Sequence, residues 1–239
     1  MSSQKTLWFE YKFIFPDGKA KLFRLDLDPE TLALLTPPPK PLPEWTALGH
    51  CKCTHCPLNE SESPQCPIAA NLADPIDFFK SQVSYEEIDL EVRTAARSYH
   101  SKTALQFALS SLLGIYMVSS GCPIMDKLRP LVALHLPLPT PRESTFRAVS
   151  MYLLAQLFLK RAGKEADWSL KRLEKIYDNI EILNEAFLKR LAAVHIQDAG
   201  LNAVFHLDTH AQFTNLFILE EGLLNLEKYF KAYLDDSSL

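Results

Sequence analysis

Glycine is scarce in this sequence, and the seven glycines among its 239 residues are scattered along the chain. A phosphate-binding loop needs closely spaced glycines, because backbone N–H groups must approach the phosphates. The sequence contains no such loop, no nucleophile elbow and no protein-kinase signature. These absences argue against nucleotide-driven chemistry.

Long blocks of one charge and long apolar runs are also missing. The 25 basic and 29 acidic residues give a formal net charge of −4, which argues against nucleic acid as the main partner. The most apolar segment, residues 104–118, is too short to cross a bilayer, so no membrane partner is expected. The N-terminal residues lack the apolar stretch of a signal peptide, which predicts a cytoplasmic protein.

Two pairs of segments with alternating polarity are present in the first half of the chain. Residues 7–15 and 19–27 flank the turn sequence Pro16-Asp17-Gly18, and residues 85–94 are followed by 97–102. Alternation with a period of two is typical of strands with one buried face. We therefore predict a four-stranded antiparallel sheet.

The remaining segments favour helices, apart from a proline-rich linker at residues 36–45. Apolar residues recur every three or four positions, which predicts helices at 67–82 (kinked or restarted at Pro75), 103–119, 123–134, 140–161, 170–191 and from 198, the last broken near 215–219. The expected fold is α+β: a small sheet with a cysteine-rich loop in residues 1–101 and a helical bundle in 102–239, as one compact domain or two.

The five cysteines are unevenly distributed. Only Cys122 stands apart in the sequence. The other four lie within sixteen residues: Cys51, Cys53, Cys56 and Cys66. In a reducing compartment, such thiols are typical of metal or redox sites rather than of disulfides. A Cys-x2-Cys turn presents two thiolates to one ion, and both zinc and iron–sulfur iron favour thiolate ligands.

Proline follows three of the cysteines, at Cys56, Cys66 and Cys122. After Cys66 and Cys122 a helix is expected to begin, which places each thiol at a helix N-terminus, where it should ionise more readily. The preferred ligand set is Cys53, Cys56, Cys66 and Cys122, because it would fasten the loop to the bundle. The alternative set replaces Cys122 with Cys51.

Several segments together resemble an uncharacterised bacterial family, a domain of unknown function with Cys-x2-Cys-Pro, Cys-Pro and Ser-Gly-Cys-Pro motifs. The resemblance covers most of the chain and is carried by CPLNESESPQCPIAANL, SSLLGIYMVSSGCPIMDKLRPL, LHLPLPT and TFRAVSMYLLAQLF. It implies that Cys53, Cys56, Cys66 and Cys122 form one group. It implies no activity.

Two other groups of polar residues are candidate sites. His206 and His210 have the spacing of two ligands on one helix face, and a third ligand would come from His195, Asp208 or Glu220. A stretch of charged residues after Cys122 supplies the catalytic candidates Arg129, His135 and Glu143. The alternative for both groups is an ordinary helix surface with caps and ion pairs.

Three functions are consistent with these residues. The first is a metal-binding scaffold, in which a four-cysteine zinc site holds together a protein that binds a protein partner or a small anionic ligand. The second is an iron–sulfur protein with a [4Fe–4S] cluster that transfers electrons or performs redox chemistry near Cys122. The third is thiol redox sensing by the Cys53–Cys56 pair. The sequence leaves open whether the protein is an enzyme.

Overall fold

The computed structural model describes residues 6–194, 198–219 and 224–236. Its sheet contains four antiparallel strands: β1 (Leu7–Ile14), β2 (Ala20–Leu27), β3 (Glu87–Thr94) and β4 (Ser98–Ala104). The strand order is β2-β1-β3-β4, and Tyr11 in β1 lies opposite Phe23 in β2 and Val92 in β3. The predicted strands and their antiparallel arrangement are confirmed.

One face of this sheet forms part of the hydrophobic core. Alternate residues of β1 are buried, among them Tyr11 and Phe13, and Phe13 packs against Phe79 with ring centroids 4.9 Å apart. The other face carries exposed ion pairs such as that of Arg24 with Glu10. This division explains the polarity pattern of the sequence.

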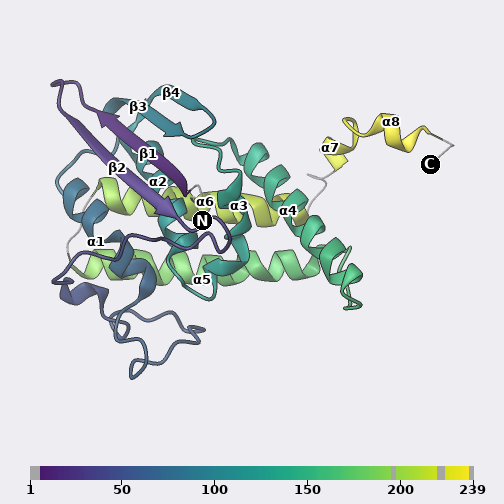
Figure 1. Cartoon of the computed structure of the whole chain (residues 1–239), viewed down its shortest axis with the longest axis horizontal. Coiled ribbons are helices and arrows are strands. Elements are labelled where there is room, and N and C mark those ends of the chain that lie inside the picture. The colour runs from purple at the N-terminus through teal and green to yellow at the C-terminus, as the bar shows by residue number, and fades with distance from the viewer. Residues whose placement is uncertain (1–5, 195–197, 220–223, 237–239) are drawn as a thin grey trace, which may run out of the picture.

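Helices occupy most of the remaining described chain. The longer ones are α1 (Pro67–Phe79), α2 (Leu105–Ser119), α4 (Pro141–Arg161), α5 (Lys171–Ala193) and α6 (Ala199–Leu219). The short ones are η1 (Glu44–Thr46), η2 (Met125–Leu128), α3 (Pro130–Ala133), α7 (Leu224–Glu227) and α8 (Lys231–Leu234). The long helices α5 and α6 run beside each other below the sheet, and α7 and α8 lie at the periphery, where Phe230 stacks on Phe146 of α4 (Figure 1).

The β4–α2 junction has no connecting residue. Ala104 is the last residue of β4, and Leu105 is the first residue of α2. This helix is buried along most of its length and packs against α6 and α1. The junction therefore fixes where each side chain of α2 lies relative to the sheet.

Two helix predictions need correction. The helix predicted at 67–82 does not restart at Pro75, because α1 continues through this residue from Pro67 to Phe79. The single helix predicted at 123–134 is divided into η2 and α3, because Pro130 lacks the N–H that would continue a helix from Asp126. The break predicted near 215–219 corresponds to the end of α6 at Leu219, and the next described helix begins at Leu224. Asn215 lies within α6, and its side-chain Nδ2 donates to Asp178 Oδ1 at 2.7 Å.

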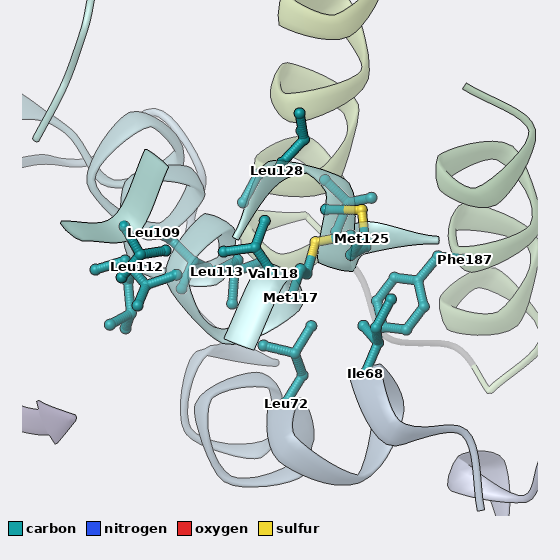
Figure 2. Close-up of a cluster of buried hydrophobic side chains, with 14 of the residues drawn as sticks. Ile68, Leu72, Leu109, Leu112, Leu113, Met117, Val118, Met125, Leu128 and Phe187 are labelled. Carbon is teal, nitrogen blue, oxygen red and sulfur yellow. The ribbon is translucent and has the colours of Figure 1, made fainter. Parts of the chain in front are cut away.

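A single hydrophobic cluster includes buried side chains from both halves of the chain, from Phe9 in β1 to Ala211 in α6. Figure 2 shows part of this cluster, with side chains of α1, α2, η2 and α5. Among the described helices, none is long and apolar enough to cross a membrane.

Candidate thiol site and ligand cavity

All five cysteines line one small cavity of about 20 Å³. They come from three parts of the chain that are distant in sequence: the loop at 51–56, the start of α1 and the turn after α2. Ile68 of α1 and Leu183, Phe187 and Arg190 of α5 complete the wall. Both proposed ligand sets are therefore gathered at the same place.

The backbone around each thiol explains this convergence. Cys53 and Cys56 share a tight turn in which the Cys56 N–H donates to the Cys53 carbonyl at 3.0 Å. Cys66 is the N-cap residue of α1, with Pro67 at the first helical position, as the sequence predicted. Its N–H donates to the Thr46 carbonyl at 2.8 Å, which connects both ends of the cysteine-rich loop.

Cys51 differs from the other four thiols. Its backbone φ of +49° lies in the left-handed region, which is uncommon for a residue with a side chain. It lines the cavity, but Cys56, Cys66 and Cys122 are the thiols whose charges act on Cys53. Besides burial, the negative charge of these three thiols raises the pKa of Cys53.

Burial dominates the acidity of two of these thiols. It raises the pKa of Cys53 to about 11, with further increases from the neighbouring thiols and a decrease from Arg190. Burial also raises the pKa of Cys122 to about 11, although the N–H groups of Met125 and Ile124 act in the opposite direction. The expectation that Cys122 ionises readily at a helix start is therefore wrong, because no long helix begins there and the thiol is buried.

Arg190 provides a buried positive charge beside the thiols. Only 2% of this residue is exposed, and its guanidinium donates to the carbonyls of Trp45, Ala47 and Leu48 at 2.6, 2.7 and 3.4 Å. In the chain as far as it is described, no Asp or Glu forms an ion pair with Arg190. A buried cation without an anionic partner is unfavourable, and Arg190 lines the same cavity as the thiols, where its charge acts to lower the pKa of Cys53.

Within the described residues, no three or more His, Cys, Asp or Glu side chains form a ready-made metal-binding group. The four thiols surround a common cavity without converging to ligand distances. Closure around an ion would require the thiols to move closer together, and coordination would deprotonate them despite the raised pKa of Cys53 and Cys122. The arrangement can therefore bind a metal only after this local adjustment.

The histidines that flank the cysteines have separate roles. The Nε2 atom of His55 lies 2.9 Å from the Asn179 carbonyl oxygen in α5, which attaches the loop to that helix. Its Nδ1 atom and the Nε2 atom of His50 are buried without a hydrogen-bond partner in the described protein. Neither histidine lines the thiol cavity.

A second, much larger cavity of about 510 Å³ lies on the other side of the turn that follows α2. The turn separates the two spaces: Met117, Val118 and Met125 line the large cavity, whereas Cys122 and Ile124 line the thiol cavity. Figure 2 shows Met117, Val118 and Met125 together, with Ile68 and Phe187 of the thiol-cavity wall nearby. The two cavities therefore share a wall.

His135 is half-buried, lines the large cavity and contacts the sheet. Its Nε2 atom lies 2.5 Å from the Tyr11 hydroxyl, which is 2.9 Å from Ser111 Oγ. Burial, helped by the charge of Arg147, lowers the pKa of His135 to about 3, and burial raises the pKa of Tyr11. Both groups are therefore neutral at physiological pH.

His206 and His210 also line this cavity, with ring centroids 4.4 Å apart. Each Nδ1 atom lies near a serine hydroxyl, at 3.2 Å from Ser110 Oγ for His206 and 3.4 Å from Ser144 Oγ for His210. Burial lowers the pKa of His206 to about 4 and lowers that of His210. The two imidazoles are therefore uncharged hydrogen-bonding groups of the cavity wall.

No third ligand for these two histidines is visible in the described residues. His195 and Glu220 lie outside them. Asp208 accepts a hydrogen bond from Gln212 at 2.8 Å and does not line the cavity. The metal site predicted at His206 and His210 therefore has no third ligand among the described residues.

The three catalytic candidates are not brought together. His135 lies in the large cavity, whereas Arg129 and Glu143 do not line it. Arg129 pairs with Asp126 and donates to the Thr31 and Val118 carbonyls. Glu143 accepts hydrogen bonds from the Thr140 N–H and hydroxyl at 2.8 and 2.9 Å, as part of a capping box at the start of α4.

Sequence reasoning missed Arg190 and the large cavity. Arg190 lies three residues after Phe187 and seven after Leu183, a spacing that places it on the buried face of α5. That spacing was the signal that could have identified it. The cavity had no comparable signal, because its lining comes from four stretches of the chain that are far apart in sequence: 101–118, 125–147, 177–184 and 206–214.

No curated protein and no solved structure matches this chain significantly. A family model described as a domain of unknown function, DUF6901, matches residues 9–231. The match begins in β1, ends in α8 and includes all five cysteines and both cavities. The chain therefore belongs to the DUF6901 family.

Proposed function

We propose that this protein binds one zinc ion through Cys53, Cys56, Cys66 and Cys122, and that the ion fastens the cysteine-rich loop to α1 and to the turn after α2. The observation that carries this proposal is the buried guanidinium of Arg190 beside the four thiols. The proposed role of the protein is binding, with the metal site as a structural element.

The charges of the site support this proposal. A zinc ion with four thiolates carries a net charge of about −2. Arg190 lines the same cavity, and its charge already acts on Cys53. A metal–thiolate centre would give this buried cation the anionic partner that no described carboxylate supplies, and Arg190 would in turn stabilise the centre.

The size of the thiol cavity favours a single ion over a cluster. Its volume of about 20 Å³ is close to the space needed by one water molecule. A [4Fe–4S] cluster contains eight inorganic atoms and needs a larger opening. The Cys-Pro pairs at Cys56, Cys66 and Cys122 are also typical of iron–sulfur proteins, so the experiment must distinguish the two metals. The small cavity volume favours zinc.

The acidity of Cys53 argues against thiol redox sensing as the main role. Reactive cysteines have a low pKa and are accessible, whereas burial raises the pKa of Cys53 to about 11. A closed site with four protein ligands also leaves no position for a substrate. We therefore place this protein among structural zinc proteins of a reducing cytoplasm, where free thiols persist.

Elemental analysis and an ultraviolet–visible spectrum of protein purified without oxygen test this function. The expected result is about one zinc per chain without visible absorption. Iron with acid-labile sulfide and visible absorption would establish the cluster instead. Metal-free protein with five freely reactive thiols would overturn both.

Two cysteine variants test the ligand set. Cys122→Ser should abolish zinc retention, whereas Cys51→Ser should leave about one zinc per chain. Cys51 is the matched control because it lines the same cavity but belongs to the alternative set. The reverse result, zinc loss only in Cys51→Ser, would assign the ion to the loop alone.

A further inference from the structure

We propose that the large cavity binds an aliphatic carboxylate, a small molecule with a flexible hydrocarbon chain and one carboxylate, whose charged end is held by Arg147. The proposed function is binding, and this inference names the class of small molecule that is bound. It stands on a different cavity from the thiols, so it does not depend on whether they bind metal.

The size and lining of the cavity suit a hydrocarbon chain. Its volume of about 510 Å³ lies within the range of small-molecule sites, roughly 300–1,000 Å³. Most of its wall is apolar, and the aliphatic side chains include Ile115, Met117, Met125, Leu128, Leu131 and Ile180. Methionine side chains adapt to flexible partners, so such a wall can accommodate an alkyl chain in several bends.

Arg147 is the one charged side chain in this lining, within the described residues. It extends from α4, and its Nη2 atom donates to the Leu131 and Leu134 carbonyls at 2.9 and 3.0 Å. Glu143 is within electrostatic range, but its carboxylate is engaged in the capping box. The guanidinium is thus held in place while it lacks an ion-pair partner among the described carboxylates.

The other polar groups of the lining are neutral. They include His135, His206, His210, Ser111 and Tyr177. Burial lowers the pKa of His135 to about 3 and that of His206 to about 4, and it raises the pKa of Tyr177, so these groups add no charge at neutral pH. A single fixed cation can neutralise one carboxylate, whereas a phosphate dianion would remain partly uncompensated.

Asn184 is a further polar group that points to a ligand. Only 2% of this residue is exposed, it lines the cavity, and its Oδ1 atom has no hydrogen-bond partner among the described atoms. Buried acceptors without a partner are unfavourable. The carboxylate itself has no donor, but a water molecule bound with the ligand can supply the missing one.

Isothermal titration calorimetry of the full-length protein with decanoate, and with decan-1-ol as its neutral analogue, tests the ligand class. The wild-type protein should bind decanoate about tenfold or more tightly than decan-1-ol, because the charge-assisted hydrogen bond is missing in the alcohol. This comparison needs no variant, so it does not depend on how well any variant folds. No binding of decanoate, or equal affinity for both, would overturn the proposal.

Variants of Gly114 test the location. A Cβ at this cavity-lining glycine of α2 would meet only Leu207 Cδ2, at 3.7 Å, so the backbone tolerates a side chain. Gly114→Leu should fill the cavity and abolish decanoate binding, whereas Gly114→Ala should retain it. Unchanged binding by Gly114→Leu would place the ligand elsewhere.

Arg147→Met tests the charged contact and should lower decanoate affinity about tenfold without changing decan-1-ol affinity. Arg161→Met is the matched control, because Arg161 lies on the same helix but is exposed. An equal loss for both ligands would contradict the role of Arg147. Metal content, measured on the same samples, separates this result from the state of the thiol site.

Discussion

Arg190 and Trp45 are joined by a hydrogen bond of 2.6 Å between the guanidinium Nη1 atom and the main-chain carbonyl. The bond connects the end of α5 to the start of the cysteine-rich loop, 145 residues earlier in the chain. A buried cation therefore holds the loop through its main-chain carbonyls, and the same cation lines the cavity that the thiols of the loop face.

Arg190→Met should lower the free energy of unfolding by about 3 kcal/mol, because buried carbonyls lose their donor and the thiol site loses its cation. Urea denaturation measures this change, and competition with a chelator should show faster metal loss. Lys189→Met, which removes an exposed charge from the same helix, should change stability by less than about 0.5 kcal/mol. Equal effects of the two variants would contradict the buried role of Arg190.

Removal of the proposed zinc ion should loosen the cysteine-rich loop more than the sheet, because ligand binding energy contributes to folding. Hydrogen exchange should become faster in residues 44–66 while residues 7–27 retain their protection. Re-addition of zinc should reverse the change. Unaltered exchange in the loop after complete metal removal would show that hydrogen bonds to Arg190 and Asn179 suffice to hold it.

His135 should make the protein less stable in mild acid. The pKa of His135 is lowered to about 3 in the folded protein, so the unfolded chain binds the extra proton between about pH 3 and 6.5. The contribution of His135 to the free energy of unfolding is fully present above about pH 6.5 and is lost as the pH falls toward 3. Between pH 7 and pH 5, the free energy of unfolding should therefore fall by about 2 kcal/mol. Denaturation at both pH values measures it.

His135→Gln should reduce that pH dependence by the same amount, whatever its effect on stability at pH 7. His100→Gln is the control, because His100 lies exposed on β4. An unchanged pH dependence in His135→Gln would mean that other groups, such as His206, account for the acid sensitivity.

Thr140→Ala should destabilise the protein by about 1 kcal/mol, because it removes the side-chain cap at the start of α4. Glu143→Gln should have a smaller effect, since glutamine can also accept the hydrogen bond of a capping box. Thermal denaturation measures both. If Glu143→Gln also abolished ligand binding in the large cavity, the capping role would be insufficient to explain this residue.

Local patterns were enough to predict the sheet and most helices. Tyr11 and Phe13 alternate with polar neighbours, and such alternation reports directly which face of a strand is buried. Pro130 shows the limit of this reasoning, because the apolar spacing around it suggested one helix while the missing donor divided it. The break predicted near 215–219 corresponds to the end of α6 at Leu219, and Asn215 lies inside this helix with its side chain bonded to Asp178 on α5.

The sequence predicted that the cysteines lie together, but it did not predict the pKa values or the charges around them. The spacing of Cys53, Cys56 and Cys66 indicated a group, and the structure places Cys122 beside it. The acidity of Cys122 was predicted in the wrong direction, because burial outweighs the nearby N–H groups and is a property of tertiary structure. The charge of Arg190 beside the thiols also depends on how α5 packs.

Because Ala104 of β4 is followed directly by Leu105 of α2, the number of residues at this junction sets the rotation of α2 relative to the sheet. One inserted residue there would rotate the whole of α2 by about 100° about its axis relative to the sheet. Ser110 and Ser111 would leave the large cavity, and the turn that carries Cys122 would start from a different side of the helix. Substitutions at this junction change one side chain, whereas an insertion or deletion would displace both sites at once.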